Sequence, residues 1–262
     1  MTKHWGICPI FHIGSLSVPS YEVLVSLAVL AALGVYLRGA ERHVKFGKST
    51  YTLLIAALIG GTLGAKLPIW VVHYREILLA LPNLAPLLSG RTIVGGLIGG
   101  VLAVEFVKRR QGIAGRTGDL FAPALALGIG IGRIGCLLRG CCYGRPTGAS
   151  WLGIDLGDGV PRYPTQIIES LFGFLLFVAL LWLRKRVVEE GRLFTIFMLA
   201  YFTFRFGIEF LRQEPRGPLG LTLAQCVCLG VIGYYLPKYL WHKEPALVSR
   251  QDESMAGGQT DG

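Results

Sequence analysis

The sequence contains few charged side chains and few histidines, and before residue 244 its one long connecting segment is a glycine-rich, charged loop at residues 139–162. Of its 262 residues, 16% are charged, five are histidine and 52% are hydrophobic. A soluble domain is about one-quarter charged, so this composition excludes an ordinary soluble globular protein. Residues 1–18 also lack the basic segment and apolar core of a cleaved signal peptide. We therefore expect the first apolar run to act as an uncleaved signal.

Seven apolar runs, separated by short loops, take up most of the chain. A helix that spans a bilayer needs about 20 mostly apolar residues, and each run is near that length. The sequence therefore predicts an all-α polytopic membrane protein with about seven transmembrane helices. One membrane domain would occupy residues 1–243, followed by a disordered cytoplasmic tail at residues 244–262. The expected spans are residues 18–37, 51–72, 92–107, 120–138, 165–183, 193–211 and 221–236.

The net charge of +10 comes from basic residues in short clusters between the apolar runs. This pattern is typical of topology signals and of contact with anionic lipids, and it does not favour a nucleic-acid partner. The loops after the first, third and fifth runs and the tail carry 15 Lys and Arg residues, whereas the N-terminus and the other loops carry 8. The more basic side is expected to be cytoplasmic. The N-terminus is then outside and the C-terminus is cytoplasmic.

Among the ionisable residues inside the apolar runs, we single out four: Lys66, Arg133, Arg205 and Glu209. Such a group is costly in a bilayer unless it meets a partner, water or a ligand. Arg205 and Glu209 are one helical turn apart and can pair, and Arg212 shares their face. Basic groups at one membrane depth suit a phosphate, which arginine binds with a bidentate fork. These residues predict a phospholipid headgroup site near the outer leaflet, with structural ion pairs as the alternative.

Glycines occur in two places that matter for this prediction. The Gly-Gly pairs in residues 95–100 have GxxxG-type spacing, which on its own favours close helix packing. Gly132 and Gly135 flank Arg133. Without side chains there, backbone N–H groups can approach the anion that Arg133 binds.

Five segments, in order along nearly the whole chain, resemble the prolipoprotein diacylglyceryl transferase family. Residues 132–144 (GRIGCLLRGCCYG) resemble its signature, G-R-x-G-N-F-x-N-x-E-x-x-G, and residues 205–212 (RFGIEFLR) resemble its R-F-x-x-E-x-x-R segment. Residues 64–67, 92–97 and 163–169 resemble its G-x-R-L, S-F-H-G-G-L and H-P-S-Q-L-Y-E segments. The resemblance implies seven transmembrane helices with the N-terminus outside.

The resemblance also implies a reaction at the outer leaflet of a bacterial plasma (inner) membrane. The diacylglyceryl group of phosphatidylglycerol would pass to the lipobox cysteine thiol of a prolipoprotein signal peptide, releasing glycerol phosphate. We expect no cofactor and no metal. The candidate catalytic residues are Arg133, Arg205, Glu209 and Tyr163, with Glu209 positioning Arg205. The candidate phosphatidylglycerol-binding residues are Arg133, Arg205, Lys66, Arg212, Gly95, Gly96, Gly132, Gly135 and Gly144.

The chain departs from the family pattern at residues suited to proton transfer. Val94 and Tyr163 replace two histidines, and His73 is the histidine best placed to act as a base instead. The family's two asparagines and its glutamate are here Cys136, Arg139 and Cys141. Two other interpretations therefore stay open: a relative that binds phosphatidylglycerol but serves another acceptor, and a non-catalytic phospholipid-binding membrane protein or transporter.

Three of the six cysteines cluster where the fourth run meets the following outer loop. They are Cys136, Cys141 and Cys142, and their spacing matches no standard zinc motif. Three interpretations of these cysteines remain open: a disulfide among them or to Cys8, buried free thiols, or a redox-active or acyl-carrying thiol.

Overall fold

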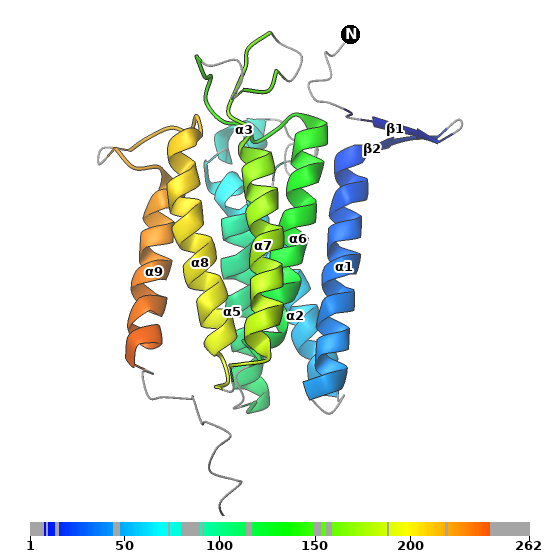
Figure 1. Cartoon of the computed structure of the whole chain (residues 1–262), viewed down its shortest axis with the longest axis vertical. Helices are drawn as coiled ribbons and strands as arrows, with labels where there is room; N and C mark the ends of the chain where they lie inside the picture. The colour runs from blue at the N-terminus through cyan, green and yellow to red at the C-terminus, as the bar shows by residue number, and fades with distance from the viewer. Residues whose placement is uncertain are drawn as a thin grey trace, which may run out of the picture.

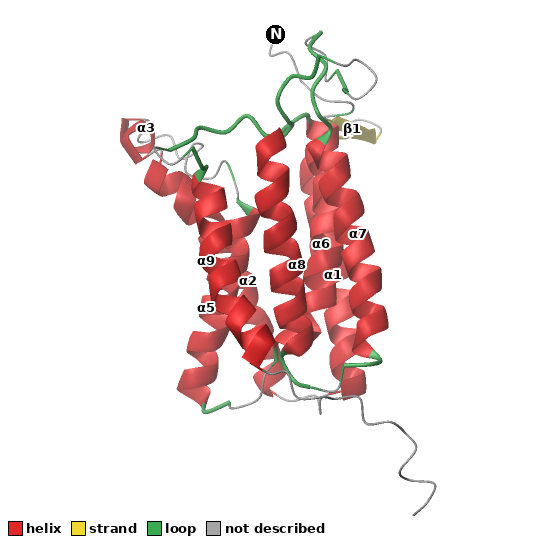
Figure 2. Ribbon diagram, turned by 60° about the vertical axis from the view of Figure 1, so that its left-hand side comes forward, coloured by secondary structure: helices red, strands yellow, loops and turns green. Residues whose placement is uncertain are grey.

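The computed structural model of the chain describes residues 8, 10–13, 16–43, 48–72, 74–79, 90, 92–113, 117–148, 153–155, 159–187, 189–217 and 220–241. The expected tail at residues 244–262 and His73 lie outside the described residues. Long helices stand side by side in a bundle, with the larger loops at one end (Figures 1 and 2).

Each of the seven apolar runs coincides with one long helix. These helices are α1 (Ser20–His43), α2 (Lys48–Val72), α5 (Ile93–Gln111), α6 (Gly118–Arg139), α7 (Thr165–Arg184), α8 (Arg192–Ile208) and α9 (Leu223–Trp241). Among them, α1, α2, α6, α7 and α8 contain stretches that are long and apolar enough to cross a membrane. The shorter described elements are α3 (Tyr74–Leu79) and the 3₁₀ turn η2 (Glu209–Leu211).

A two-stranded hairpin precedes the first helix. Strand β1 (Ile10–Ile13) pairs antiparallel with β2 (Leu16–Pro19), and Val18 lies opposite Phe11. Helix α1 therefore begins at Ser20 rather than at residue 18. Pro19, the last residue of β2, has a fixed φ angle and no N–H to donate. A proline is therefore better suited to the end of a strand than to a helix interior.

The outer surface of the bundle is apolar, as expected for a protein whose solvent is lipid. Large apolar side chains such as Leu63 on α2, and Leu171 and Val178 on α7, are exposed. The main interior cluster lies where α6, α7, α8 and α9 meet, around Phe197 and Phe202. Contiguous apolar surface on this scale is rare in soluble monomers.

Glycines allow α2 and α5 to pack closely. A Cβ atom added to Gly64 would lie 2.5 Å from the Gly95 carbonyl oxygen and 2.7 Å from Gly99 Cα. A Cβ atom added to Gly96 would lie 3.3 Å from the Gly61 carbonyl oxygen. The close helix packing predicted from the glycine spacing is therefore confirmed.

A tertiary cap fixes the start of α8 at the end of the bundle opposite the loop after α6. Asp119, in the first turn of α6, accepts hydrogen bonds from the backbone N–H groups of Gly191 (2.6 Å) and Phe194 (2.8 Å). These N–H groups lie at a helix N-terminus, where they have no intrahelical partner. The carboxylate of one helix thus sets the position of α8, the helix that carries Arg205.

Candidate active site

The site begins with an ion pair between two neighbouring helices. Arg133 on α6 and Glu169 on α7 meet with 2.6 Å between Nη2 and Oε2. Their side chains are 6% and 1% exposed. A charge this deep needs a partner, because desolvation costs several kcal/mol per ion. Sequence analysis assigned no role to Glu169. Its position as an acidic residue inside the apolar run 165–183 was the signal that could have identified it.

A second ion pair joins Arg205 at the end of α8 to Glu209 in η2, with 2.5 Å between Nη1 and Oε2. This confirms the pair predicted from their spacing. The Thr222 hydroxyl donates to Glu209 Oε1 (3.0 Å). Thr222 and Gln225 also bond each other's backbone N–H groups, which forms a capping box at the start of α9. The sequence T-x-x-Q carried this signal, but sequence reasoning missed it.

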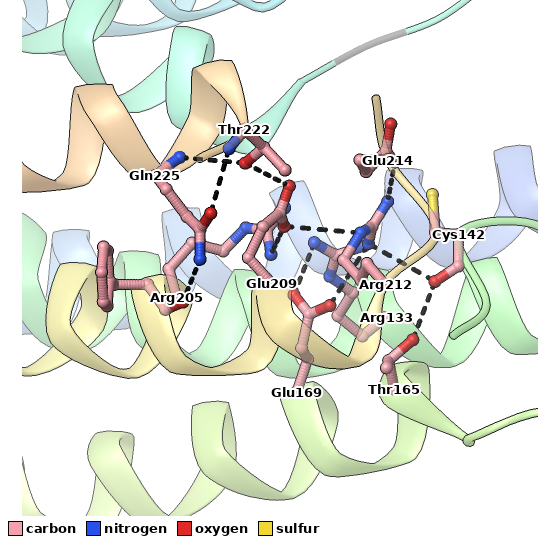
Figure 3. A network of polar contacts seen from close by, with 11 residues as sticks. Arg133, Cys142, Thr165, Glu169, Arg205, Glu209, Arg212, Glu214, Thr222 and Gln225 are labelled. Carbon is pink, nitrogen blue, oxygen red and sulfur yellow. Dashed lines mark hydrogen bonds and ion pairs between the residues drawn. The ribbon is translucent and has the colours of Figure 1, made fainter. Parts of the chain in front are cut away.

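Arg212 connects the two ion pairs (Figure 3). Its Nη1 lies 3.5 Å from Glu169 Oε1, and its Nε lies 3.6 Å from Glu209 Oε2. Its Nη2 also contacts the more exposed Glu214 at 2.9 Å. We call Arg133, Glu169, Arg212, Glu209 and Arg205 the arginine–glutamate network. These five buried side chains carry three positive charges and two negative charges, an excess of one, because the remaining acidic contact, Glu214, is 43% exposed and screened by solvent.

The loop after α6 is joined by backbone bonds to the segment that carries Arg212. Gly144 N–H donates to the Tyr163 carbonyl (3.0 Å), and Arg145 N–H donates to the Leu211 carbonyl (2.8 Å). A Cβ atom on Gly144 would lie 2.7 Å from Tyr163 Cβ and 2.8 Å from the Leu211 carbonyl oxygen. Gly144 therefore permits this close approach. The Tyr163 ring contacts the Arg145 guanidinium at 6.0 Å from the centroid.

The remaining predicted residues lie around the network or on other helices. A Cβ atom on Gly132 would meet nothing within 4 Å, whereas one on Gly135 would lie 3.0 Å from Leu24 Cβ of α1. Lys66 is half-buried on α2, which packs mainly against α5. Gly95 and Gly96 lie in the α2–α5 contact. The network itself is built from α6, α7, α8 and the segment that follows α8.

Tyr201 is a further buried polar residue that sequence reasoning missed. It lies on α8 one turn before Arg205 and is 1% exposed. It is close enough to Arg133 and Arg205 to interact with both charges. Its hydroxyl has no hydrogen-bond partner among the residues that the structure describes. A buried hydroxyl of this kind is available to a ligand that enters between the two arginines.

The six cysteines are free thiols, so no disulfide joins Cys8 to Cys136, Cys141 or Cys142. Cys142 follows α6 and lies beside the network. Hydrogen bonds with the thiols of Cys136 and Cys141, helped by the charges of Arg133 and Arg212, lower the pKa of Cys142 below that of an ordinary thiol, although burial acts in the opposite direction.

An apolar groove of about 270 Å³ lies between α6 and α7. Its wall is formed by Ile134, Leu137, Gln166, Ile167, Ser170, Leu171 and Phe174. Ile167 and Leu171 are 41% and 58% exposed, so the groove opens sideways on the outer surface of the bundle.

Comparison with known proteins agrees with this arrangement. The family model described as prolipoprotein diacylglyceryl transferase matches residues 9–241, which include every long helix and the whole network. The chain belongs to the prolipoprotein diacylglyceryl transferase family. Family membership, together with the long apolar helices, makes it a multi-pass membrane protein.

Named members of the family align over most of the chain. A protein of Clostridium perfringens called phosphatidylglycerol–prolipoprotein diacylglyceryl transferase 2 is 35% identical over 87% of this chain and 94% of its own length. Proteins called phosphatidylglycerol–prolipoprotein diacylglyceryl transferase from Clostridium tetani and Geobacter sulfurreducens are 33% and 34% identical. These two alignments cover 85% and 80% of this chain, and 92% and 84% of the relatives.

Proposed function

We propose that the protein spans a bacterial plasma (inner) membrane seven times, with the N-terminus outside and the C-terminus in the cytoplasm. The distribution of charge along the bundle supports this orientation. The basic clusters at residues 108–110 and 184–186 end α5 and α7, at the end of the bundle opposite the network (Figure 1). Basic residues favour the cytoplasmic side. The network is then near the outer leaflet.

We further propose that the protein transfers the diacylglyceryl group of phosphatidylglycerol to the lipobox cysteine of a prolipoprotein. The observation that carries this proposal is the excess positive charge of the arginine–glutamate network. A phosphodiester headgroup carries one negative charge and would neutralise that excess. Lys66, Gly95, Gly96, Gly132, Gly135 and Gly144 remain proposed headgroup-binding residues, although Gly95 and Gly96 lie in the α2–α5 contact. Tyr163 remains a proposed catalytic residue.

The groove between α6 and α7 is suited to the acyl chains of the same lipid. Its wall includes Ile134, which follows Arg133 in the chain, and Ser170, which follows Glu169, and most of its side chains are apolar. A lipid entering sideways from the outer leaflet would place its chains along Leu137 and Leu171 and its phosphate at the network. Because the chains pass from the hydrocarbon of the bilayer to an apolar wall, the groove contributes van der Waals packing to binding rather than removal of the chains from water.

The charge of the network also suits the chemical step. The acceptor sulfur forms a bond to the glyceryl carbon while the bond from that carbon to the phosphate oxygen breaks. The negative charge on the phosphate therefore increases in the transition state, and the proton of the thiol is lost to the released glycerol phosphate or to water. Fixed guanidinium groups stabilise this developing charge more than the ground state, which is the requirement for catalysis.

An assay in proteoliposomes tests the function. The vesicles contain phosphatidylglycerol, and the acceptor is a peptide with one lipobox cysteine. The wild type should release glycerol phosphate and produce an equal amount of thioether-linked peptide. Arg133→Gln and Arg205→Gln should each lower the rate by about 100-fold or more, as for the loss of one donor that stabilises an oxyanion. Arg186→Gln, which removes an exposed charge at the opposite end of the bundle, should leave the rate unchanged.

A second candidate function is transfer to a different acceptor. It is favoured by Val94, Cys136 and Cys141, which differ from the family pattern where that pattern has histidine, asparagine and glutamate. Expression in cells depleted of their own transferase separates the two functions. Lipidated prolipoprotein supports the first, whereas a folded protein that binds phosphatidylglycerol without lipidating any prolipoprotein contradicts it and favours the second.

A further inference from the structure

The three outer-loop cysteines form one compact thiol cluster. The sulfur atoms of Cys136, Cys141 and Cys142 all lie within 4.8 Å of one another. Cys136 is buried in the last turn of α6, and the other two are half-buried just after that helix. The spacing of these cysteines predicted no metal, but the fold brings their sulfurs together.

The end of α6 brings the first two sulfurs together. Gly140, with φ of 73°, ends the helix in the left-handed conformation. The N–H of Gly140 donates to the Leu137 carbonyl (3.1 Å), and the N–H of Cys141 donates to the Cys136 carbonyl (3.0 Å). These two bonds define a Schellman motif, in which the residues at the positions of Cys136 and Cys141 normally make an apolar contact. That motif explains two sulfurs but not the third.

The third sulfur belongs to Cys142, whose backbone is strained and is held by several hydrogen bonds. Cys142 has φ of 60°, and no other non-glycine residue in the described part of the chain has a positive φ. Its carbonyl accepts hydrogen bonds from the Thr165 hydroxyl (3.0 Å) and from Arg212 Nη1 (3.4 Å), as Figure 3 shows. The buried Gln166 donates to the Cys141 carbonyl at 2.8 Å. Strain that persists under several restraints often marks a functional position.

The chemistry of three convergent thiols is that of a soft metal site. Thiolates select closed-shell thiophilic ions such as Cu(I) and Zn²⁺. With metal–sulfur bonds of about 2.3 Å, three sulfurs around one ion lie about 4 Å apart, which is within the 4.8 Å limit of this cluster. Small movements of the half-buried side chains are enough to reach that geometry.

The surrounding charges favour a metal–thiolate complex over a free cation. Three thiolates with Zn²⁺ carry one negative charge, and with Cu(I) they carry two. Arg133 and Arg212 both act on Cys142, and the network beside it has an excess of one positive charge. Guanidinium groups stabilise thiolates and would repel a hard cation held by neutral oxygens.

We propose that Cys136, Cys141 and Cys142 form a binding site for one soft, thiophilic metal ion, Cu(I) or Zn²⁺, beside the headgroup site. The ion reaches the sulfurs from the side of the outer loop, where Cys141 and Cys142 are partly exposed. Each thiol loses its proton to water when it binds the ion. This site is separate from the transferase function, and its test requires no enzyme activity.

Metal titration of the purified full chain tests the proposal. The protein is reduced and kept without oxygen in lipid nanodiscs, then titrated separately with Cu(I) and Zn²⁺ against a chelator of known affinity. We expect one ion per chain to be retained through desalting. X-ray absorption should show three sulfur ligands at about 2.3 Å.

Serine variants assign the ligands. Cys142→Ser should lower the metal affinity by more than the roughly 10–100-fold that is typical when a residue hydrogen-bonded to a metal ligand is replaced. The triple variant with serine at positions 136, 141 and 142 should retain no ion. Cys226→Ser is the matched control, since Cys226 is exposed on α9, and it should bind like the wild type. Circular dichroism in nanodiscs confirms that each variant is helical.

Three results would overturn the proposal. The first is retention of no ion by the reduced wild type. The second is equal retention by the wild type and a folded Cys142→Ser variant, which indicates non-specific binding. The third is mass spectrometry of protein from native membranes that finds two of the three cysteines joined in a disulfide, because the thiols are then not available to a metal.

Discussion

Glu169 has a central position among the individual residues of the site. It is the carboxylate that contacts both Arg133 and Arg212, and it is 1% exposed. Without its charge, the network would hold three arginines against one glutamate. The charge of Glu169 therefore keeps two buried guanidinium groups close together while leaving an excess of one positive charge for a ligand.

Glu169→Gln tests this role. The substitution keeps the size of the side chain but removes its charge, and loss of one partner of a buried ion pair typically costs about 3–5 kcal/mol. We expect a loss of stability of that order, measured by thermal unfolding in detergent. Glu214→Gln is the control, because Glu214 contacts the same Arg212 but is 43% exposed. An exposed pair contributes about 0–1 kcal/mol, so equal effects of the two variants would contradict a buried network.

Sequence reasoning was most successful for residues whose partners are local. The Arg205–Glu209 pair follows from helical spacing and was predicted. The Arg133–Glu169 pair joins two helices, and no local pattern determines which face of α6 meets which face of α7. The thiol cluster is local in the sequence, but its spacing matches no metal motif because a left-handed turn, rather than a helix face, brings the sulfurs together.

At the scale of elements, the close contact of α2 and α5 depends on glycine. Gly99→Ala should destabilise the protein, because the new Cβ atom would lie 2.7 Å from Gly64 Cα. Forcing backbones apart in a packed interior typically costs about 1–3 kcal/mol.

The matched control is Gly34→Ala on α1, where an added Cβ atom meets nothing within 4 Å. Alanine is about 1 kcal/mol better than glycine in a helix interior, so this variant should be neutral or slightly stabilised. Thermal unfolding of both variants in the same detergent measures the difference. Equal melting temperatures would show that the glycine contact is not needed.

The apolar runs predicted the long helices well, because length and hydropathy alone determine them. The β1–β2 hairpin was not predicted, since its apolar residues continue into the first apolar run and no charge separates them. The 3₁₀ turn at the end of α8 was also missed. That turn matters for the site, because it redirects the chain so that Arg212 lies between Glu209 and Glu169.

At the scale of the whole molecule, the proposed orientation predicts which loops are exposed outside the cell. Two single-cysteine substitutions test this orientation. Asp155→Cys places a thiol in the loop between α6 and α7, and Gln111→Cys places one at the end of α5. An impermeant maleimide should label position 155 in intact cells, and position 111 only after the membrane is opened. Mass spectrometry of the labelled peptide distinguishes each position from the six natural cysteines. The reverse labelling pattern would contradict the orientation.

The central claim is that Arg133 and Arg205 belong to one site for an anionic lipid headgroup. The sequence located both arginines, but their connection through Arg212 became evident only from the fold.

Native mass spectrometry of the purified protein, equilibrated with equal amounts of phosphatidylglycerol and the zwitterionic phosphatidylethanolamine, tests this claim most directly. The wild type and Arg186→Gln should retain phosphatidylglycerol preferentially, whereas Arg133→Gln and Arg205→Gln should both lose that preference. Unchanged retention of phosphatidylglycerol by either folded variant would contradict the shared site.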